Sequence, residues 1–415
     1  MSFSEWRKTK VDEVAEAIFS GGTPNTKIEE YWNGEYNWLS SGETRNAYIK
    51  QTEKTITSEG VNNSSTRLAL KDDVVIASAG QGYTRGQVSY CMIDTYINQS
   101  IIAIRAKKDE LLPKYLFFNL RNRYEELRQI SDGNSIRGSI TTKHIKALDI
   151  FIPPLPEQKA IAATLSALDD MIELNNQINK TLEEMAQALF KSWFVDFEPF
   201  KDGEFEESEL GLIPKGWRVG TLSSIGDIIG GGTPSKSKPE YYADSGIPWI
   251  TPKDLSMNKN KYISRGQFDI SELGLRESSA KLMPKGTVLF SSRAPIGYIA
   301  IAKNAVTTNQ GFKSIVPFNN ISSEYVYLLL KNNIGEIESR ASGSTFKEIS
   351  GGEMKKVPII LPPMDVINQF NEIATTLGKV QALLEDENNI LSSIRDTLLP
   401  KLMSGEIRVP VEEVV

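Results

Sequence analysis

The stretch "GGTPNTKIEEYWNG" at residues 21–34 returns in altered form as "GGTPSKSKPEYYAD" at residues 231–244, about half a chain length later. The likeness extends to both sides of it. "EWRKTKVDEVAEAIFS" leads into the first copy and "GWRVGTLSSIGDIIG" into the second, and Trp38 after the first copy matches Trp249 after the second. An ordered series of matches over roughly 200 residues indicates a duplication. The chain therefore contains two copies of one module.

The matches within the modules predict their secondary structure. "GVNNSSTRLALKDDVVIASA" from Gly60 aligns without a gap with "GLRESSAKLMPKGTVLFSSR" from Gly274, which pairs Lys71 with Lys285 and Ser78 with Ser292. Runs rich in β-branched residues and bounded by polar turns predict short strands. They are followed by two helix-like stretches, "PKYLFFNLRNRYEELRQI" and "SEYVYLLLKNNIGEIES". Each module is thus expected to be a mixed α+β domain.

Each module closes on an apolar strand that runs into Pro-Pro, and the hydrophobic period then becomes helical for about 36 residues. At 1.5 Å per residue such a helix is roughly 50 Å long, too long for one compact domain. Apolar steps of three and four residues predict that the two helices pair as an antiparallel coiled coil with pseudo-twofold symmetry. The predicted contact positions are Ile161, Leu165, Leu168, Ile172, Asn175, Asn179, Leu182, Ala186, Leu189 and Trp193 in the first helix, and Val366, Phe370, Ile373, Leu377, Val380, Leu384, Glu387, Leu391, Ile394 and Leu398 in the second.

Composition excludes several classes of site. The chain has 415 residues, 40% of them apolar, which is enough for two or three cores, and no run of about 18 apolar residues or apolar signal core is present. It is therefore expected to be cytoplasmic and not to bind a membrane. One cysteine, Cys91, and one histidine, His144, cannot form a zinc cluster, and both are expected to be structural. The chain lacks the GxxxxGK[ST] phosphate loop and the Asn-Pro-Pro-aromatic motif of amino methyltransferases.

The charge is distributed unevenly along the chain. The net charge of −6 argues against a nucleic-acid partner, but residues 225–360 carry 17 Lys and Arg against 12 Asp and Glu. Residues 15–152 carry 17 against 16, which leaves 13 basic and 25 acidic residues for the rest of the chain. The acidic surplus lies outside the modules, and their polar turns combine Arg, Lys, Asn and Gln with aromatic residues. These side chains can read base edges in the major groove.

Several segments resemble the specificity subunits of type I restriction-modification enzymes: "IPPLPEQKAIA" at 152–162, "LFKSWFVDFEPF" at 189–200, "GLIPKGWRVGTL" at 211–222 and "LLPKLMSGEIRV" at 398–409. The resemblance covers essentially the whole chain, although "PPMDVIN" at 362–368 departs from the "PPLPEQ" type. It implies target recognition domains at 1–152 and 200–361, a central conserved helical region at 153–199 and a distal one with the C-terminal tail at 362–415.

The resemblance also implies a division of labour. Each target recognition domain would read one half of a bipartite, asymmetric double-stranded DNA site, and the helices would dock two modification subunits and set the half-site spacing. Methyl transfer from S-adenosylmethionine and restriction that uses ATP and magnesium would belong to the modification and restriction subunits. The chain itself would hold no cofactor or metal and would not be an enzyme.

Two glycine pairs, Gly21 with Gly22 and Gly231 with Gly232, are expected to let a loop turn tightly so that the polar residues after it face DNA. The candidate DNA contacts are Thr23, Lys27, Arg45, Arg85, Asn98, Gln99 and Arg137 in the first module, and Thr233, Lys236, Lys238, Lys253, Arg293, Asn309, Gln310 and Lys347 in the second. An alternative is a coiled-coil scaffold whose end modules bind proteins. A third hypothesis, a fused methyltransferase, is rejected because the chain lacks the cofactor and Asn-Pro-Pro motifs that such an enzyme needs.

Overall fold

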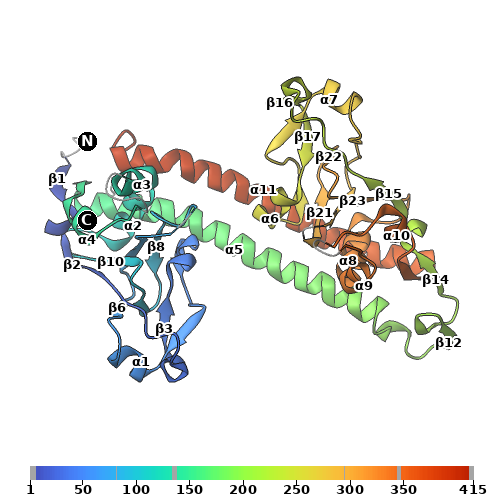
Figure 1. Ribbon diagram of the computed structural model, residues 1–415, viewed down its shortest axis with the longest axis horizontal. Coiled ribbons are helices and arrows are strands. Elements are labelled where there is room, and N and C mark those ends of the chain that lie inside the picture. The colour runs from blue at the N-terminus through green and yellow to red at the C-terminus, as the bar shows by residue number, and fades with distance from the viewer. Residues whose placement is uncertain (1–5, 81, 133–137, 294, 344–346, 411–415) are drawn as a thin grey trace. The chain divides into compact units, whose positions relative to one another are not determined.

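The computed structural model describes residues 6–80, 82–132, 138–293, 295–343 and 347–410 of the chain (Figure 1). It divides into two compact units. Unit 1 comprises residues 1–171 and 391–415, and unit 2 comprises residues 172–390. The first module lies in unit 1 and the second in unit 2, and each long helix contributes residues to both units.

Unit 1 contains a five-stranded sheet, a four-stranded sheet and a two-stranded ribbon. The five-stranded sheet has the order β2 (Ala15–Ser20), β10 (Ile101–Ala106), β7 (Val74–Ala77), β8 (Val88–Cys91), β4 (Tyr48–Ile49). The four-stranded sheet has the order β5 (Lys54–Ile56), β3 (Trp32–Leu39), β9 (Thr95–Ile97), β6 (Arg67–Ala69), and β1 (Arg7–Lys10) pairs with β11 (Asp149–Ile152). The short helices are η1 (Val11–Glu13), η2 (Glu29–Tyr31), η3 (Ser41–Arg45), α1 (Ser58–Asn62), α2 (Pro113–Arg121), α3 (Tyr124–Asp132) and α4 (Thr142–Ala147).

Unit 2 repeats this arrangement. Its five-stranded sheet has the order β15 (Gly226–Gly230), β23 (Lys313–Pro317), β20 (Val288–Ser292), β21 (Ile296–Ala302), β18 (Tyr262–Ile263). The four-stranded sheet has the order β16 (Tyr242–Ala243), β19 (Phe268–Ile270), β17 (Ile247–Ile250), β22 (Thr307–Thr308), and two ribbons pair β14 (Arg218–Thr221) with β24 (Pro358–Leu361) and β12 (Phe205–Ser208) with β13 (Gly211–Pro214). The short helices are η4 (Glu198–Phe200), η5 (Leu222–Ser224), η6 (Pro239–Tyr241), α6 (Pro252–Met257), α7 (Glu272–Arg276), α8 (Ser323–Asn332), α9 (Ile334–Ser339) and α10 (Gly351–Lys355).

The duplication predicted from the sequence is confirmed at the level of single hydrogen bonds. The N–H of Ser78 donates to the carbonyl of Ser100 at 2.8 Å, and the N–H of Ser292 donates to the carbonyl of Gly311 at 2.7 Å. The turns before β7 and β20 both need a left-handed residue, which is Asp72 (φ 77°) in one and Gly286 (φ 87°) in the other. The mixed α+β fold class is therefore correct.

Helices α5 (Leu155–Phe194) and α11 (Met364–Ser404) each start directly after a Pro-Pro pair, a position at which proline is well tolerated. α11 ends before Gly405, whose positive φ of 75° is typical of a helix C-cap. Within unit 2 the two helices run antiparallel. Asn175 donates to Glu387 at 3.0 Å, and further along α5 the rings of Phe190 and Phe370 lie 5.9 Å apart.

The predicted contact line is largely correct for α5 but only partly correct for α11, where Val366, Phe370 and Leu391 are buried as predicted. Ile161, Leu165, Asn175 and Ala186 of α5 are buried, whereas the predicted contacts Ile373, Val380 and Ile394 of α11 are more than 39% exposed. Elsewhere the buried residues of α11 lie one position after the predicted ones, at Ala374, Gly378, Gln381, Glu385 and Leu399. Part of this line is polar or lacks a side chain, so hydrophobic periodicity could not reveal it.

The two long helices share a core with each module. In unit 1, Ile161, Leu165 and Leu402 pack with the sheet residues Ile102 and Ile104. In unit 2, the rings of Phe194 and Phe370 lie 4.9 Å apart and join Tyr325 of α8 in one cluster. Each module is therefore fastened to its stretch of the helix pair by apolar packing. Among the described residues, no helix combines the length and the apolar character that a membrane crossing needs.

Candidate nucleic-acid interface

Three loops of unit 1 meet beyond the ends of the parallel strands β3 and β9. The first loop, residues 21–28, is fixed by the N–H of Gly22, which donates to the carbonyl of Ile97 at 3.0 Å, and by the indole of Trp38, which donates to the carbonyl of Gly22 at 3.3 Å. The second loop follows β3 and the third follows β9. The hydroxyl of Thr23 donates to the amide oxygen of Gln99, so the first and third loops touch at their exposed ends.

Unit 2 builds the same cluster with the same bonds. The N–H of Gly232 donates to the carbonyl of Thr308, and the indole of Trp249 donates to the carbonyl of Gly232, each at 2.9 Å. Thr233 donates to the amide oxygen of Gln310. The loop after β17 carries α6, whose N-cap Thr251 and Asp254 form a capping box, as Ser40 and Glu43 do before η3 in unit 1.

The four loop glycines have a different role from the one expected. None of them is among the described glycines with positive φ, so they do not provide a left-handed turn. A Cβ atom on Gly21 would overlap the backbone of Ile97, and one on Gly231 would overlap the backbone of Asn309. Glycine is needed because the loop lies directly against the neighbouring strand end.

The predicted contact residues fall into three groups by exposure. Two are buried, Arg85 and Asn98, and Arg137 lies outside the described residues. Four are half-buried: Thr23, Thr233, Arg293 and Asn309. Eight are exposed: Lys27, Arg45, Gln99, Lys236, Lys238, Lys253, Gln310 and Lys347.

Arg85 and Asn98 have structural contacts. The guanidinium of Arg85 donates to the carbonyl of Gly138 at 3.2 Å and is 9% exposed. The side-chain oxygen of Asn98 accepts from the N–H of Ser100 at 2.9 Å, and that of Asn309 accepts from the N–H of Gly311 at 2.9 Å. These two asparagines shape the turn after β9 and β22. Gln99 and Gln310 are the residues of these turns that face solvent.

In unit 2, five predicted residues surround one hollow of about 550 Å³: Thr233, Lys236, Lys253, Asn309 and Gln310. Three other predicted residues of this module, Lys238, Arg293 and Lys347, do not line the hollow. The ammonium of Lys238 donates to the hydroxyl of Tyr241 at 2.8 Å, which raises the pKa of this lysine. The guanidinium of Arg293 pairs with Glu348 at 3.4 Å, and in unit 1 Arg45 pairs with Glu53.

The sequence reading missed the aromatic side of the hollow. Tyr242, Trp249, Gln267 and Phe268 also line it, and Phe268 is 53% exposed although it is large and apolar. The stretch "RGQFDI" at 265–270 mixes basic, amide and aromatic residues and was the available signal. The register places Phe268 opposite Trp249, where unit 1 has Lys54 opposite Trp38. Equivalent positions of the two clusters thus carry different chemistry.

The two structural residues singled out in the sequence are as expected. Cys91 is fully buried, and burial raises the pKa of its thiol. His144 closes a capping box at the start of α4, where its Nδ1 accepts from the N–H of Thr141 at 3.3 Å. Among the described residues, no group of three or more His, Cys, Asp or Glu side chains is arranged to hold a metal ion.

Comparisons with known proteins match the chain along its length. The family model described as the type I restriction modification DNA specificity domain matches residues 3–184 and again residues 214–395. The MjaIX specificity subunit of Methanocaldococcus jannaschii is 31% identical, over 98% of this chain and 94% of that protein. The HindI specificity subunit of Haemophilus influenzae is 30% identical, over 76% of this chain and 82% of that protein.

A solved structure shares the fold. The S subunit of the type I restriction-modification system from M. genitalium superposes with a TM-score of 0.60 at 17% identity, covering 97% of this chain and 96% of that chain. The family model matches once per module, in agreement with the duplicated sheets and loop clusters. The chain therefore belongs to the family of specificity subunits of type I restriction-modification enzymes.

Proposed function

We propose that each loop cluster reads one half of a bipartite, asymmetric site in double-stranded DNA, and that the chain itself catalyses no reaction. The observation that carries this proposal is one scaffold built twice with different side chains at equivalent positions, such as Lys54 and Phe268. Two domains with the same fold but different surfaces would suit two half-sites of different sequence. The same scaffold with identical surfaces would suit a palindrome.

The exposed groups of unit 2 suit such a reader. Gln310 is held by Thr233 at the rim of the hollow, and an amide can form a bidentate pair with the N6 and N7 groups of adenine. Lys236 and Lys253 also line the hollow, where an ammonium group can neutralise a phosphate or contact guanine. Phe268 offers an apolar surface for a thymine methyl group.

The long helices supply surface for protein partners, which we propose to be two modification subunits, joined by restriction subunits in the full complex. Within unit 2, Leu174, Ile178 and Met185 lie on one face of α5 at steps of four and seven residues and are exposed. Val380, Leu383 and Ile390 form a similar exposed line on α11. S-adenosylmethionine, ATP and magnesium would bind to these partner chains.

The test uses the chain in complex with its modification partner. Lys253→Met should weaken DNA binding at every sequence and lower the slope of log K against log salt by about 1. Gln310→Ala should weaken binding to the cognate site by about tenfold and relax one base of a single half-site in the methylome. Lys215→Met, which removes an exposed lysine paired with Glu204 in the β12–β13 ribbon, is the control.

The scaffold alternative makes the opposite prediction. If the end modules bind proteins, the complex retains no DNA at any salt concentration and Gln310→Ala leaves the methylome unchanged. Methylation by the isolated chain with labelled S-adenosylmethionine would instead overturn the non-catalytic part of the proposal.

A further inference from the structure

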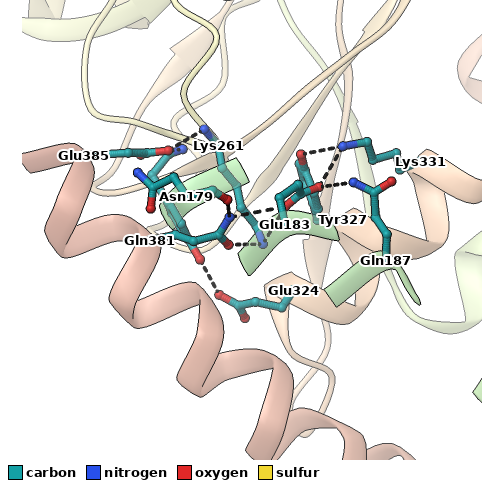
Figure 2. A network of polar contacts seen from close by, with 10 residues as sticks. Asn179, Glu183, Gln187, Lys261, Glu324, Tyr327, Lys331, Gln381 and Glu385 are labelled. Atoms are coloured by element: carbon teal, nitrogen blue, oxygen red, sulfur yellow. Dashed lines mark hydrogen bonds and ion pairs between the residues drawn. The ribbon is translucent and has the colours of Figure 1, made fainter. Parts of the chain in front are cut away.

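A charged network is buried in unit 2 where the second module meets the helix pair (Figure 2). Its centre is Glu183 of α5, which accepts from Lys331 of α8 at 2.7 Å and faces Lys261 at 3.5 Å. The side chain of Lys261 is 5% exposed, and its ammonium donates to Gln381 of α11 at 3.0 Å. Burial opposes the ionised form of Glu183, but the two lysines outweigh it and lower the pKa of the carboxyl.

A second carboxylate holds the backbone of the same segment. Glu385 of α11 accepts from the N–H of Lys261 at 2.7 Å and from the N–H of Tyr262 at 3.1 Å. Tyr262 begins β18, the edge strand of the five-stranded sheet. Glu183 and Glu385 therefore fix one segment of the module to both long helices, one through its side chain and the other through its backbone.

Such a network is a poor source of stability. Removing charges from water costs several kcal/mol per ion, and apolar replacements of buried ion pairs are often neutral or stabilising. Apolar contacts already fasten the module, since Phe194, Tyr325 and Phe370 pack in one cluster. The charges instead make the position of the module unique, because a buried cation is tolerated only next to its partner anion.

The sequences of α5 and α11 place a suitable carboxylate at one position of each helix. One heptad before and after Glu183 stand Asn176 and Phe190, and one heptad before and after Glu385 stand Gly378 and Ser392. A module displaced by a heptad along α5 would bury Lys261 without the carboxylate of Glu183, and one displaced along α11 would leave the N–H groups of Lys261 and Tyr262 without Glu385.

We propose that Glu183, Lys261 and Glu385 form a register lock that fixes the second module at one position along the helices and so restricts the DNA spacer to one length. This inference rests on the proposed function. One helical turn is about 5.4 Å and one heptad about 10.5 Å, which correspond to roughly 1.5 and 3 base pairs of duplex. A module free to shift along the helices by a turn would therefore accept spacers that the locked module rejects.

The decisive variant is Lys261→Met with Glu183→Gln in the full chain with its modification partner. It removes the buried cation, keeps a hydrogen-bonding group at position 183, and leaves Lys331 partly exposed to solvent. We expect a melting temperature close to that of the parent and unchanged half-site sequences. Methylation at sites whose spacer differs by one base pair should rise about tenfold, equivalent to a loss of ~1.4 kcal/mol of discrimination.

The control is Lys180→Met with Glu184→Gln, an exposed pair on the same helix, which should leave the spacer and its stringency unchanged. Glu385→Gln is a second test that keeps the buried lysine and removes one backbone acceptor, and it should relax the spacer as well. A single, unrelaxed spacer in both network variants would overturn the lock. If the parent complex methylates no bipartite site, the proposed function fails instead.

Discussion

Gly378 lies in the interior of α11, where glycine costs about 1 kcal/mol relative to alanine. A Cβ atom there would overlap the hydroxyl of Tyr262, which donates to Glu324 at 3.0 Å. Gly378→Ala should therefore lower the melting temperature despite its better helix propensity. Adding Tyr262→Phe, which removes the overlapping oxygen, should restore at least half of the loss. Thermal unfolding followed by circular dichroism measures both, and a rise in melting temperature for Gly378→Ala alone would contradict the account.

Residues with local partners were predictable from the sequence, and residues with distant partners were not. His144 was expected to be structural, and its partner Thr141 lies only three positions away. Arg85 looked like an exposed loop residue because its partner, the carbonyl of Gly138, lies 53 positions further along the chain. Gly21 and Gly231 were recognised as loop glycines, but the strand backbone that excludes a side chain there is visible only in the fold.

At the scale of single elements, α11 is expected to respond to pH through Glu385. Burial raises the pKa of this carboxyl to about 7 from an ordinary 4.5, and its bonds to the N–H groups of Lys261 and Tyr262 and the charge of Lys303 only partly oppose this. The folded state thus binds a proton more tightly than the unfolded state, and stability due to this group falls as pH rises from about 4.5 to 7.

Glu385→Gln does not titrate, so it should gain stability relative to the parent between pH 5 and pH 8, by up to about 3 kcal/mol. The informative quantity is the change with pH in the stability difference between variant and parent. The lost backbone acceptor lowers the variant's stability at every pH and so does not produce this change. Denaturant unfolding at several pH values measures it, with Glu372→Gln, an exposed carboxylate of the same helix, as a control expected to show no such change. A difference that stays constant from pH 5 to 8 would count against a buried, proton-binding Glu385.

The existence and approximate length of α5 and α11 were predicted from the sequence, because a helical period that lasts about 36 residues after Pro-Pro allows few alternatives. The two helices have 40 and 41 residues. The contact face of α11 was predicted only in part, since Val366, Phe370 and Leu391 are buried but other predicted contacts are not. Ile373, Val380 and Ile394 form an apolar line as regular as a coiled-coil seam, yet they are exposed. Helix periodicity detects apolar lines without telling which one faces the partner helix, and here the buried line includes Gln381 and Glu385.

At the scale of the whole molecule, the two loop clusters should act independently, since each is built from the loops and strands of its own unit. Replacing residues 1–150 with the same region of a relative should change one half-site of the methylated motif and leave the other unchanged. Methylome sequencing of cells that carry the chimera with its modification partner measures this. A chimera in which both half-sites change together would rule out independent readers.

The two positions that hold a module on the helix pair are not chemically interchangeable. Ala47, which directly precedes β4, is equivalent to Lys261, which directly precedes β18. Asp169 of α5 is equivalent to Gly378 of α11, because each lies sixteen residues after the first proline of the Pro-Pro pair before its helix. In unit 1, Asp169 accepts from Tyr48 and pairs with Arg121 and Arg395. Gly378 has no side chain to form such bonds, and Tyr262, the counterpart of Tyr48, donates to Glu324 instead.

This asymmetry has a consequence for how such genes can diversify. A first module placed in the second slot would deprive Tyr48 of its acceptor Asp169 and leave Glu183 without its buried lysine. A second module in the first slot would bury Lys261 near Arg395. We therefore expect that modules can be exchanged between alleles at the same slot more easily than between the two slots of one gene, because the chemistry of the helices opposes the second exchange.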